Sequence, residues 1–346
     1  MHRLVRHRGA EEARALGEDL GDFSGRTGLS PSPMCTLAKM RWLMERGAPP
    51  PTRVLSVADW VVHALGGDQA FEASLASRTG ALDVPRRRWW AEALEWAGAG
   101  ASSFPPLSRA GEPAGLARRG PFEGAVLTSA GHDHLCAAAG AGAISVDQVL
   151  DSCGTAEALV RTVGPLGTSA LRRAVAAGLA GGCHVLPGRW ALLAGGPLGM
   201  LLERVLRLLG VQERHEVERL DETAATVSPG RLRVVARGFF GDPSVEGLHP
   251  GVSPAALWAA ALDETRRAVL APLEAMQRLA GPATELVLSG GWARCQGVRR
   301  RRASLLPSVR WPAVEEAGAR GAALFAGLAA GVFAAPEDFP KPEQRA

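Results

Sequence analysis

The sequence predicts a mixed α/β fold, and three observations carry this prediction. Short apolar segments rich in Val and Leu recur from about residue 124 onward, and several of them end in glycine. Long segments with apolar residues at helical spacing separate them, which is typical of strands that alternate with helices. With 346 residues, and roughly 150 residues per domain, the chain is long enough for two domains that each bury a core.

The first quarter of the chain is predicted to be almost wholly helical. Residues 10–20 and 36–45 have helical spacing, and prolines mark the loop between them. The segment SVADWVVHALGG (56–67) reads as a helix that ends at a glycine pair. The segment RRRWWAEALEWAGA (86–99) reads as one more helix, with tryptophans on its apolar faces.

The rest of the chain is predicted to alternate between strand segments and long amphipathic helices. The strand segments are GAVLTSAG (124–131), VLDSCGTAEALVRTV (149–163), HVLPGRWALLAGG (184–196), RLRVVARGFF (231–240) and ELVLSGG (285–291). The helical segments are residues 197–210, 253–279 and 315–333. Residues 336–346 form a polar, proline-rich tail.

The composition excludes several classes of function. Lys39 and Lys341 are the only lysines, and neither lies in a P-loop motif or in the strand context of a protein kinase. The five cysteines are scattered without a C-x-x-C motif, which argues against a disulfide framework and a zinc ribbon. Acidic residues accompany the basic ones nearly everywhere, so we expect no nucleic-acid partner. The one dense basic run, residues 299–302, is interpreted as a solvated helix face.

No targeting or membrane segment is expected. The N-terminus lacks the apolar core of a secretory signal peptide. The longest uncharged stretches are too rich in small residues and too interrupted for a membrane span. We therefore expect a cytoplasmic protein without membrane contact.

One strand segment ends in Gly131-His132-Asp133-His134, directly before a helix of small residues. A carboxylate at such a strand end can act as a general base toward a substrate hydroxyl. Two other interpretations stay open. Asp133 could cap the following helix, or the alternating His132, His134 and Cys136 could bind a metal ion. A helix that begins at Asp133 would remove the geometry that metal binding requires.

Two further segments carry glycines where phosphate could meet free backbone N–H groups. In Asp151-Ser152-Cys153-Gly154-Thr155, a glycine and hydroxyl side chains lie in a tight hairpin turn. The pair Gly290-Gly291 follows the strand ELVLS and permits a ligand to approach the backbone closely. Each segment alone is also explained by an ordinary turn or strand end.

A longer motif lies upstream, in residues 34–45 (MCTLAKMRWLME). Its Lys39, a hydrophobic residue and Trp42 have the spacing of the first signature of the FGGY family of carbohydrate kinases, which the segment resembles; it departs from the family at Arg46. Further segments resemble the family in the same order along the chain, over roughly residues 8 to 335. They are Asp59-Trp60, the Ser74/Ser77/Thr79/Gly80/Asp83 series with Trp89, SAGHDHLCAAAGAGA (129–143), DSCGTAEAL (151–159), LSGGWAR (288–294) and GARGAALFAGLAAGVF (318–333).

The resemblance implies an actin-like, ribonuclease-H-like ATPase fold with two domains around a cleft. Residues 1–145 would be the remainder of the N-terminal, sugar-side domain, residues 146–335 the C-terminal, nucleotide-side domain, and residues 336–346 the tail. The implied activity is ATP-dependent phosphorylation of a hydroxyl of a sugar or polyol, with Mg²⁺ neutralising phosphate charge. A homodimer is also expected, because dimers are common among soluble enzymes of this size.

The same resemblance implies roles for particular residues. Asp133 would be the catalytic base, and His132 and His134 would contact the substrate beside it. The transferring phosphate would be held by Ser152, Gly154 and Thr155. The nucleotide would be flanked by Gly290, Gly291, Ala293 and Arg294. No side chain is assigned to a metal ion.

The chain also departs from the family pattern. It has no D-x-G-[TS] phosphate loop, and of the W-x-D-x-R segment only Arg8 fits, so the first domain is expected to be incomplete at its N-terminus. Residues 236–251 lack the second family signature. Two alternatives therefore stand beside an active kinase: a non-catalytic, truncated remnant that binds sugar, nucleotide or a partner, and a metal-dependent enzyme built on His132, Asp133, His134 and Cys136.

Overall fold

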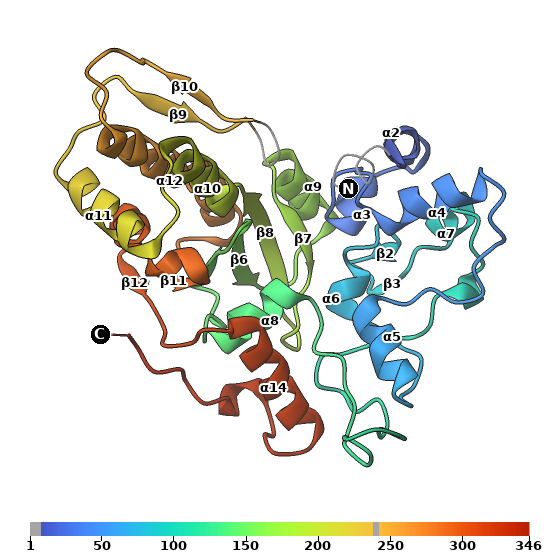
Figure 1. Cartoon of the computed structure of the whole chain (residues 1–346). Coiled ribbons are helices and arrows are strands. Elements are labelled where there is room, and N and C mark those ends of the chain that lie inside the picture. The colour runs from blue at the N-terminus through green and yellow to red at the C-terminus, as the bar shows by residue number, and fades with distance from the viewer. Residues whose placement is uncertain (1–7, 238–241, 346) are drawn as a thin grey trace. The chain divides into compact units, whose positions relative to one another are not determined.

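The computed structural model describes residues 8–237 and 242–345 (Figure 1). The chain divides into two compact units. Unit 1 comprises Met1–Cys136, Thr162–Leu192 and Gly318–Lys341, and unit 2 comprises Ala137–Arg161, Leu193–Ala317 and Pro342–Ala346. Both units are built from separate stretches of the chain, and the domain boundary expected between residues 145 and 146 stays a prediction.

The N-terminal part of unit 1 is mainly helical, as predicted. Helices α2 (Ala10–Asp19), α4 (Thr36–Met44) and α5 (Val57–Ala64) confirm three of the predicted helices. Each buries its apolar side, with Leu16, Leu37 and Val62 in the core. The other elements before residue 110 are short: α3 (Phe23–Thr27), β1 (Phe71–Glu72), α6 (Ala73–Ala76), β2 (Leu82–Asp83), η1 (Ala101–Ser103) and β4 (Leu107–Ser108).

The predicted helix over residues 86–99 is wrong in its first part. Arg88–Trp89 form strand β3, which pairs antiparallel with β2, and helix α7 (Ala91–Trp96) begins only after Trp90. Arg87 adopts a left-handed backbone conformation with φ 50°, which turns the chain back on β2. The three tryptophans therefore do not share one helix: Trp89 lies on the hairpin, Trp90 caps α7 and Trp96 ends it.

The predicted strand over residues 124–131 is also wrong. The segment makes only an isolated bridge between Leu116 and Val126, supported by backbone bonds such as Ala114 N to Leu127 O at 2.7 Å. Val126 is exposed, so its apolar pattern does not mark a buried face. The loop leads directly into α8 (Asp133–Gly140).

The central sheet has the strand order β12-β11-β5-β6-β8-β7. The bounds are Ser308–Arg310 (β12), Glu285–Ser289 (β11), Gln148–Cys153 (β5), Glu157–Val163 (β6), Trp190–Gly196 (β8) and Ala180–Cys183 (β7). These strands confirm the predicted segments at 149–163, 184–196 and 285–291. Strand β11 runs parallel to β5, and β5 and β6 form an antiparallel hairpin. Strand β11 therefore ends, and β6 begins, close to the end of β5 at Cys153.

Helices of unit 2 include two that the sequence predicted, α10 (Leu198–Leu209) and α12 (Pro254–Ala280). Helix α12 begins at a proline, after Ser253, whose hydroxyl accepts from Ala256 N and caps the helix. The remaining elements are α11 (Arg214–Ala225), η2 (Gly291–Arg294), α13 (Gln296–Arg302) and the hairpin of β9 (Arg233–Val235) with β10 (Ser244–Glu246). The predicted strand at 231–240 is thus confirmed at β9, and its residues 238–240 lie outside the described residues.

The predicted polar tail, residues 336–346, makes specific contacts with the rest of the chain. In unit 1, α9 (Thr168–Ala176) and the predicted helix α14 (Ala317–Ala329) are present. After α14 comes η3 (Pro336–Asp338), and Phe339 packs edge-on against Phe325 at 5.4 Å between ring centroids. In unit 2, Gln344 bridges to Pro312. No helix of the described residues is both long and apolar enough to cross a membrane.

The arginine run at 299–302 is not simply a solvated helix face, which corrects that prediction. Arg299 lies over the Trp311 ring at 4.0 Å, and Arg300 and Arg301 pair with Asp221 and Asp263. Arg302 is fully buried and pairs with Asp151 on β5, Nε to Oδ2 at 2.7 Å, and with Glu157 on β6. One side chain thus holds both strands of the hairpin whose turn contains Gly154 and Thr155.

The charges of this buried cluster balance only if one carboxyl group is protonated. Arg302 carries one positive charge, and its two partners would carry two negative charges. Burial raises the pKa of Glu157 well above its usual range, and the nearby negative charge of Asp151 is the second cause of this shift. Burial also raises the pKa of the Cys153 thiol, whose sulfur lies 3.3 Å from Asp151 Oδ1. We infer a neutral cluster of ionised Asp151, Arg302 and protonated Glu157.

A second buried carboxyl group lies in unit 1. Glu72 is 1% exposed and precedes α6, where its carboxylate accepts from Ser74 N at 2.8 Å and Leu75 N at 3.1 Å. It therefore caps this short helix. Burial, opposed by these hydrogen bonds, raises the pKa of Glu72 to about 7.

The neutral state of Glu157 leads to a first prediction. Glu157→Gln replaces a protonated carboxyl group by a neutral group of the same shape, so the free energy of unfolding should change by about 1 kcal/mol or less. Asp151→Asn instead leaves the buried Arg302 charge without an anion and should cost about 3–5 kcal/mol. Urea denaturation at neutral pH measures both variants. Equal losses in the two variants would show that Glu157 is ionised.

The raised pKa of Glu72 leads to a second prediction. The folded chain binds the Glu72 proton up to about pH 7, whereas the unfolded chain releases it near pH 4.5. The unfolding free energy should therefore fall as the pH rises between these values, by about 3 kcal/mol. Glu72→Gln should abolish this part of the pH dependence, and the exposed control Glu95→Gln on α7 should retain it. Urea denaturation across the pH range decides, and identical pH profiles for all three proteins would refute the assignment.

Candidate functional site

The backbone places Asp133 at the first position of α8, in unit 1. The His132 carbonyl accepts from Leu135 N at 3.0 Å and Cys136 N at 2.9 Å, so His132 occupies the cap position. Asp133 Oδ1 accepts from His134 N at 2.7 Å and lies 3.0 Å from His132 Nδ1. Its side chain is 82% exposed and therefore open to a substrate.

The surroundings of Asp133 favour its ionised form. The pKa of Asp133 lies well below its usual range, mainly because of the contact with the His132 ring. Partial burial opposes this shift, and the charge of His134 adds to it. The positive end of the α8 dipole also favours a carboxylate at this position. Asp133 is therefore a carboxylate at neutral pH. The helix-capping interpretation fits in part, because Oδ1 bonds one N–H group of the first turn while the side chain stays open to solvent.

The metal-binding interpretation of His132, His134 and Cys136 does not fit the geometry. Cys136 is buried, its thiol donates to Ala130 O at 2.9 Å, and burial raises its pKa to about 12. In residues 8–237 and 242–345, three potential ligand atoms come close together in one place, at Asp151, Cys153 and Glu157. The alternation in the sequence is lost because α8 begins at Asp133.

The two glycine segments of the sequence meet in unit 2. Gly290 follows β11 with φ 90°, and a Cβ atom there would lie 2.7 Å from Cys153 O. The β5–β6 turn also touches the start of α10, where Met200 N donates to Thr155 O at 2.9 Å and a Cβ at Gly199 would lie 2.7 Å from Thr155 Cα. Glycines thus allow three backbone segments to approach one another around the turn.

A cavity of about 590 Å³ opens beside these segments, and we call it the nucleotide-loop cavity. Four of the residues predicted to bind phosphate or nucleotide line it: Gly154, Thr155, Gly291 and Arg294. Three others do not line it. Ser152 lies in the β5 ladder opposite Ser289, Gly290 packs on Cys153, and Ala293 is fully buried. The structure keeps these three next to the cavity wall, where they support the lining residues.

Sequence reasoning missed several lining residues of the nucleotide-loop cavity. They are Gln212, Arg214, Val217, Glu218, Trp292 and Cys295. Three of them, Arg214, Val217 and Glu218, come from α11, a helix whose polar sequence carried no motif. Trp292 follows the glycine pair directly, and its ring lies 6.3 Å from the Trp258 ring. Its position directly after the glycine pair was the one sequence feature that could have identified Trp292 as a lining residue.

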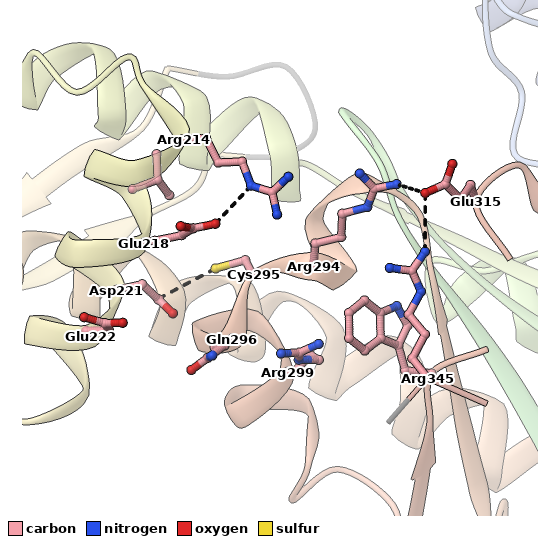
Figure 2. Close-up of a pocket in the computed structure, with 12 residues that line it drawn as sticks. Arg214, Glu218, Asp221, Glu222, Arg294, Cys295, Gln296, Arg299, Glu315 and Arg345 are labelled. Atoms are coloured by element: carbon pink, nitrogen blue, oxygen red, sulfur yellow. Dashed lines mark hydrogen bonds and ion pairs between the residues drawn. The ribbon is translucent and has the colours of Figure 1, made fainter. Parts of the chain in front are cut away.

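A second cavity of about 600 Å³ adjoins the first and shares Arg214, Val217, Glu218, Arg294 and Cys295 with it (Figure 2). Figure 2 shows its ion pairs: Arg214 with Glu218 at 2.9 Å, and Glu315 with Arg294 at 2.9 Å and Arg345 at 3.6 Å. The Cys295 thiol lies between the two cavities, and burial raises its pKa to about 11. The Arg294 side chain, 44% exposed and paired with Glu315, lines both cavities.

The predicted residues thus form two groups, one in each unit. His132, Asp133 and His134 lie together at the start of α8 in unit 1. Ser152, Gly154, Thr155, Gly290, Gly291, Ala293 and Arg294 lie in unit 2, on or directly behind one cavity wall.

Curated relatives of the chain are sugar and polyol kinases. The L-fuculokinase of Escherichia coli K12 is 28% identical over 320 residues, which cover 88% of this chain and 66% of that protein. A probable glycerol kinase of Caenorhabditis elegans is 26% identical over 165 residues, which cover 45% of this chain and 33% of that protein. The chain therefore spans about two thirds of the first protein's length and matches one third of the second.

Solved structures show the same fold. The xylulose kinase of Rhodospirillum rubrum superposes with a TM-score of 0.84 at 20% identity, over 98% of this chain and 72% of that one. The glycerol kinase of Plasmodium falciparum, solved with ADP, gives a TM-score of 0.81 at 15% identity, over 95% of this chain and 70% of that one. The mixed α/β arrangement is the actin-like ATPase fold, as the sequence predicted. Residues 6–140 match the N-terminal domain of the FGGY family of carbohydrate kinases. The chain is therefore similar to the FGGY family of carbohydrate kinases over residues 6–140, and its fold is that of the solved sugar and glycerol kinases.

Proposed function

We propose that this protein transfers the γ-phosphate of ATP to a hydroxyl group of a sugar or polyol. The observation that carries the proposal is the nucleotide-loop cavity, where two glycine segments far apart in the sequence line one wall. Glycines permit the close backbone approach that phosphate groups require. The kinases among the relatives supply the reaction class.

Asp133 is the general base of the proposed reaction. Its carboxylate takes the proton of the attacking hydroxyl, the hydroxyl oxygen bonds to the γ-phosphorus, and the bond from the γ-phosphorus to the bridging oxygen breaks to release ADP. The lowered pKa of Asp133 keeps it ready to accept a proton at neutral pH. His132 and His134 orient the carboxylate and contact the substrate.

The residues of unit 2 position the nucleotide. Thr155, which is exposed, and the backbone of the turn at Gly154 hold the transferring phosphate, with Ser152 behind them. Gly291 and Arg294 line the path of the nucleotide, and Gly290 and Ala293 set the loop that presents them. Catalysis by such a site consists mainly of positioning and charge neutralisation.

Mg²⁺ is the ion that we propose to accompany ATP. It prefers hard oxygen ligands. Of the described residues, only Asp151, Cys153 and Glu157 bring three potential ligand atoms together, and Arg302 already neutralises the carboxylate charge there. A thiol and a charge-paired carboxylate do not suit Mg²⁺, so this cluster does not fit the ion. None of the proposed steps requires a side chain of this protein to bind Mg²⁺.

The proposal also covers the compartment, the partners and the oligomeric state of the protein. We expect it to act in the cytoplasm, with a sugar or polyol and ATP as its partners and without nucleic acid or membrane. A homodimer is the expected assembly.

The role of Asp133 leads to a third prediction. Asp133→Ala removes the base and should lower sugar-dependent ADP formation about 10²- to 10⁴-fold, since a positioned base contributes this much. ATP binding, measured by calorimetry, should be unchanged because Asp133 lies outside the nucleotide-loop cavity. Retained turnover in Asp133→Ala would remove it as the base. Nucleotide binding by the unaltered protein without turnover on any pentose, hexose or polyol would favour the non-catalytic remnant.

Gly291 leads to a fourth prediction. A Cβ atom at Gly291 would meet no atom within 4 Å, and its φ lies outside the left-handed region. Gly291→Ala should therefore leave the melting temperature unchanged but weaken ADP binding about tenfold, because the methyl group enters the space reserved for the ligand. Gly164→Ala, which also adds a Cβ in open space, serves as the control and should bind ADP normally. Unchanged affinity in Gly291→Ala would place the nucleotide elsewhere.

A further inference from the structure

A chain of buried contacts leads from Glu72 to the start of α8. The Ser74 hydroxyl donates to the Glu72 carboxylate, and its oxygen accepts from His132 N at 2.9 Å. The next residue along the chain is Asp133, whose carboxylate lies 3.0 Å from the His132 ring. Glu72 and Ser74 are both 1% exposed, so water does not compete for these bonds.

Gly131 shows how closely the chain packs against this pair. It has φ 91°, and a Cβ atom there would lie 2.6 Å from Ser74 Oγ and 2.7 Å from Glu72 Oε2. The backbone at Gly131, directly before α8, therefore packs closely against the side chains of Glu72 and Ser74. Any other residue at 131 would displace the turn that carries Asp133.

We propose that Glu72 and Ser74 are positioning residues that hold the His132-Asp133 turn in the orientation needed for catalysis. The proposal rests on the proposed function of Asp133 as the base. Neither residue touches the substrate; both act through the His132 backbone. A hydrogen bond at His132 N fixes the Gly131–His132 peptide plane, one residue before Asp133, and thereby constrains the direction in which the carboxylate leaves the helix.

The same short helix offers a matched control in Ser77. Ser77 is also 1% exposed, its hydroxyl donates to Ala73 O at 2.9 Å, and its oxygen accepts from Cys183 N at 3.0 Å. The two serines thus bond a backbone N–H group of a distant segment in the same way. Only Ser74 bonds the segment that carries Asp133, whereas Ser77 bonds β7.

The first measurement compares steady-state kinetics of Ser74→Ala and Ser77→Ala in the full chain. Both variants lose the two hydrogen bonds of a buried hydroxyl and should lose similar stability. Ser74→Ala should lower kcat about 10- to 100-fold, since a small misplacement of a reacting group has this effect, with KM for ATP unchanged. Ser77→Ala should keep the kcat of the unaltered protein. Equal kcat values for the two variants would overturn the proposal.

A second measurement works without turnover and separates the positioning role from the proposed function. Amide hydrogen exchange followed by NMR should show loss of protection at His132 N–H in Ser74→Ala alone, and at Cys183 N–H in Ser77→Ala alone. A crystal structure of Ser74→Ala should show the Asp133 carboxylate displaced. An unaltered protein without kinase activity would refute the proposed function; normal His132 protection and an unmoved Asp133 in Ser74→Ala would refute the positioning role.

Discussion

The buried pairing of Arg302 with two carboxyl groups is the interaction on which the β5–β6 turn and the glycine loop after β11 depend. Arg302 comes from α13, which follows the Gly290-Gly291 loop, and its partners flank the β5–β6 turn on both sides. Its guanidinium therefore ties the segment that follows the Gly290-Gly291 loop to the β5–β6 turn. Removal of the Asp151 carboxylate would leave the Arg302 charge unpaired in a fully desolvated place, and this cost far exceeds that of a surface ion pair. The loops are thus held by an element that no ligand needs to contact.

Unit 1 holds its reactive group by a different means. No arginine or lysine approaches Asp133 among the contacts of the described residues; a histidine ring, the adjacent N–H group and the helix terminus favour its charge instead. Behind it, hydroxyl and backbone groups surround Glu72. Hydrogen bonds are more directional than ion pairs, and they fix an orientation at a smaller cost in desolvation. This suits a base that must point at a hydroxyl, whereas the phosphate loops chiefly require rigidity.

Most of the long elements could be predicted from the sequence, because apolar spacing is strong in α10, α12 and β11. The wrong segments show the limit. Residues 86–99 have a helical pattern, but the left-handed Arg87 and the pairing with β2 are tertiary effects that no local pattern encodes. The order of motifs identified Gly154, Thr155, Gly291 and Arg294 on one cavity wall. It missed Arg214 and Glu218, because residues that reach a cavity from a polar helix look like any solvated face. Arg302 was misread for the same reason: its charge suggested solvent, and only the fold reveals its buried partners.

The open position of the Asp133 side chain has a consequence for fidelity. Water reaches a carboxylate that is 82% exposed as easily as a sugar hydroxyl does. In the role proposed for it, Asp133 would make no distinction between the two nucleophiles, and activated water would waste ATP by hydrolysis. Discrimination must then come from the substrate itself, which excludes solvent as it covers the carboxylate. A smaller polyol leaves more of that surface wet than a hexose does, so the fraction of ATP lost to water should depend on the size of the acceptor.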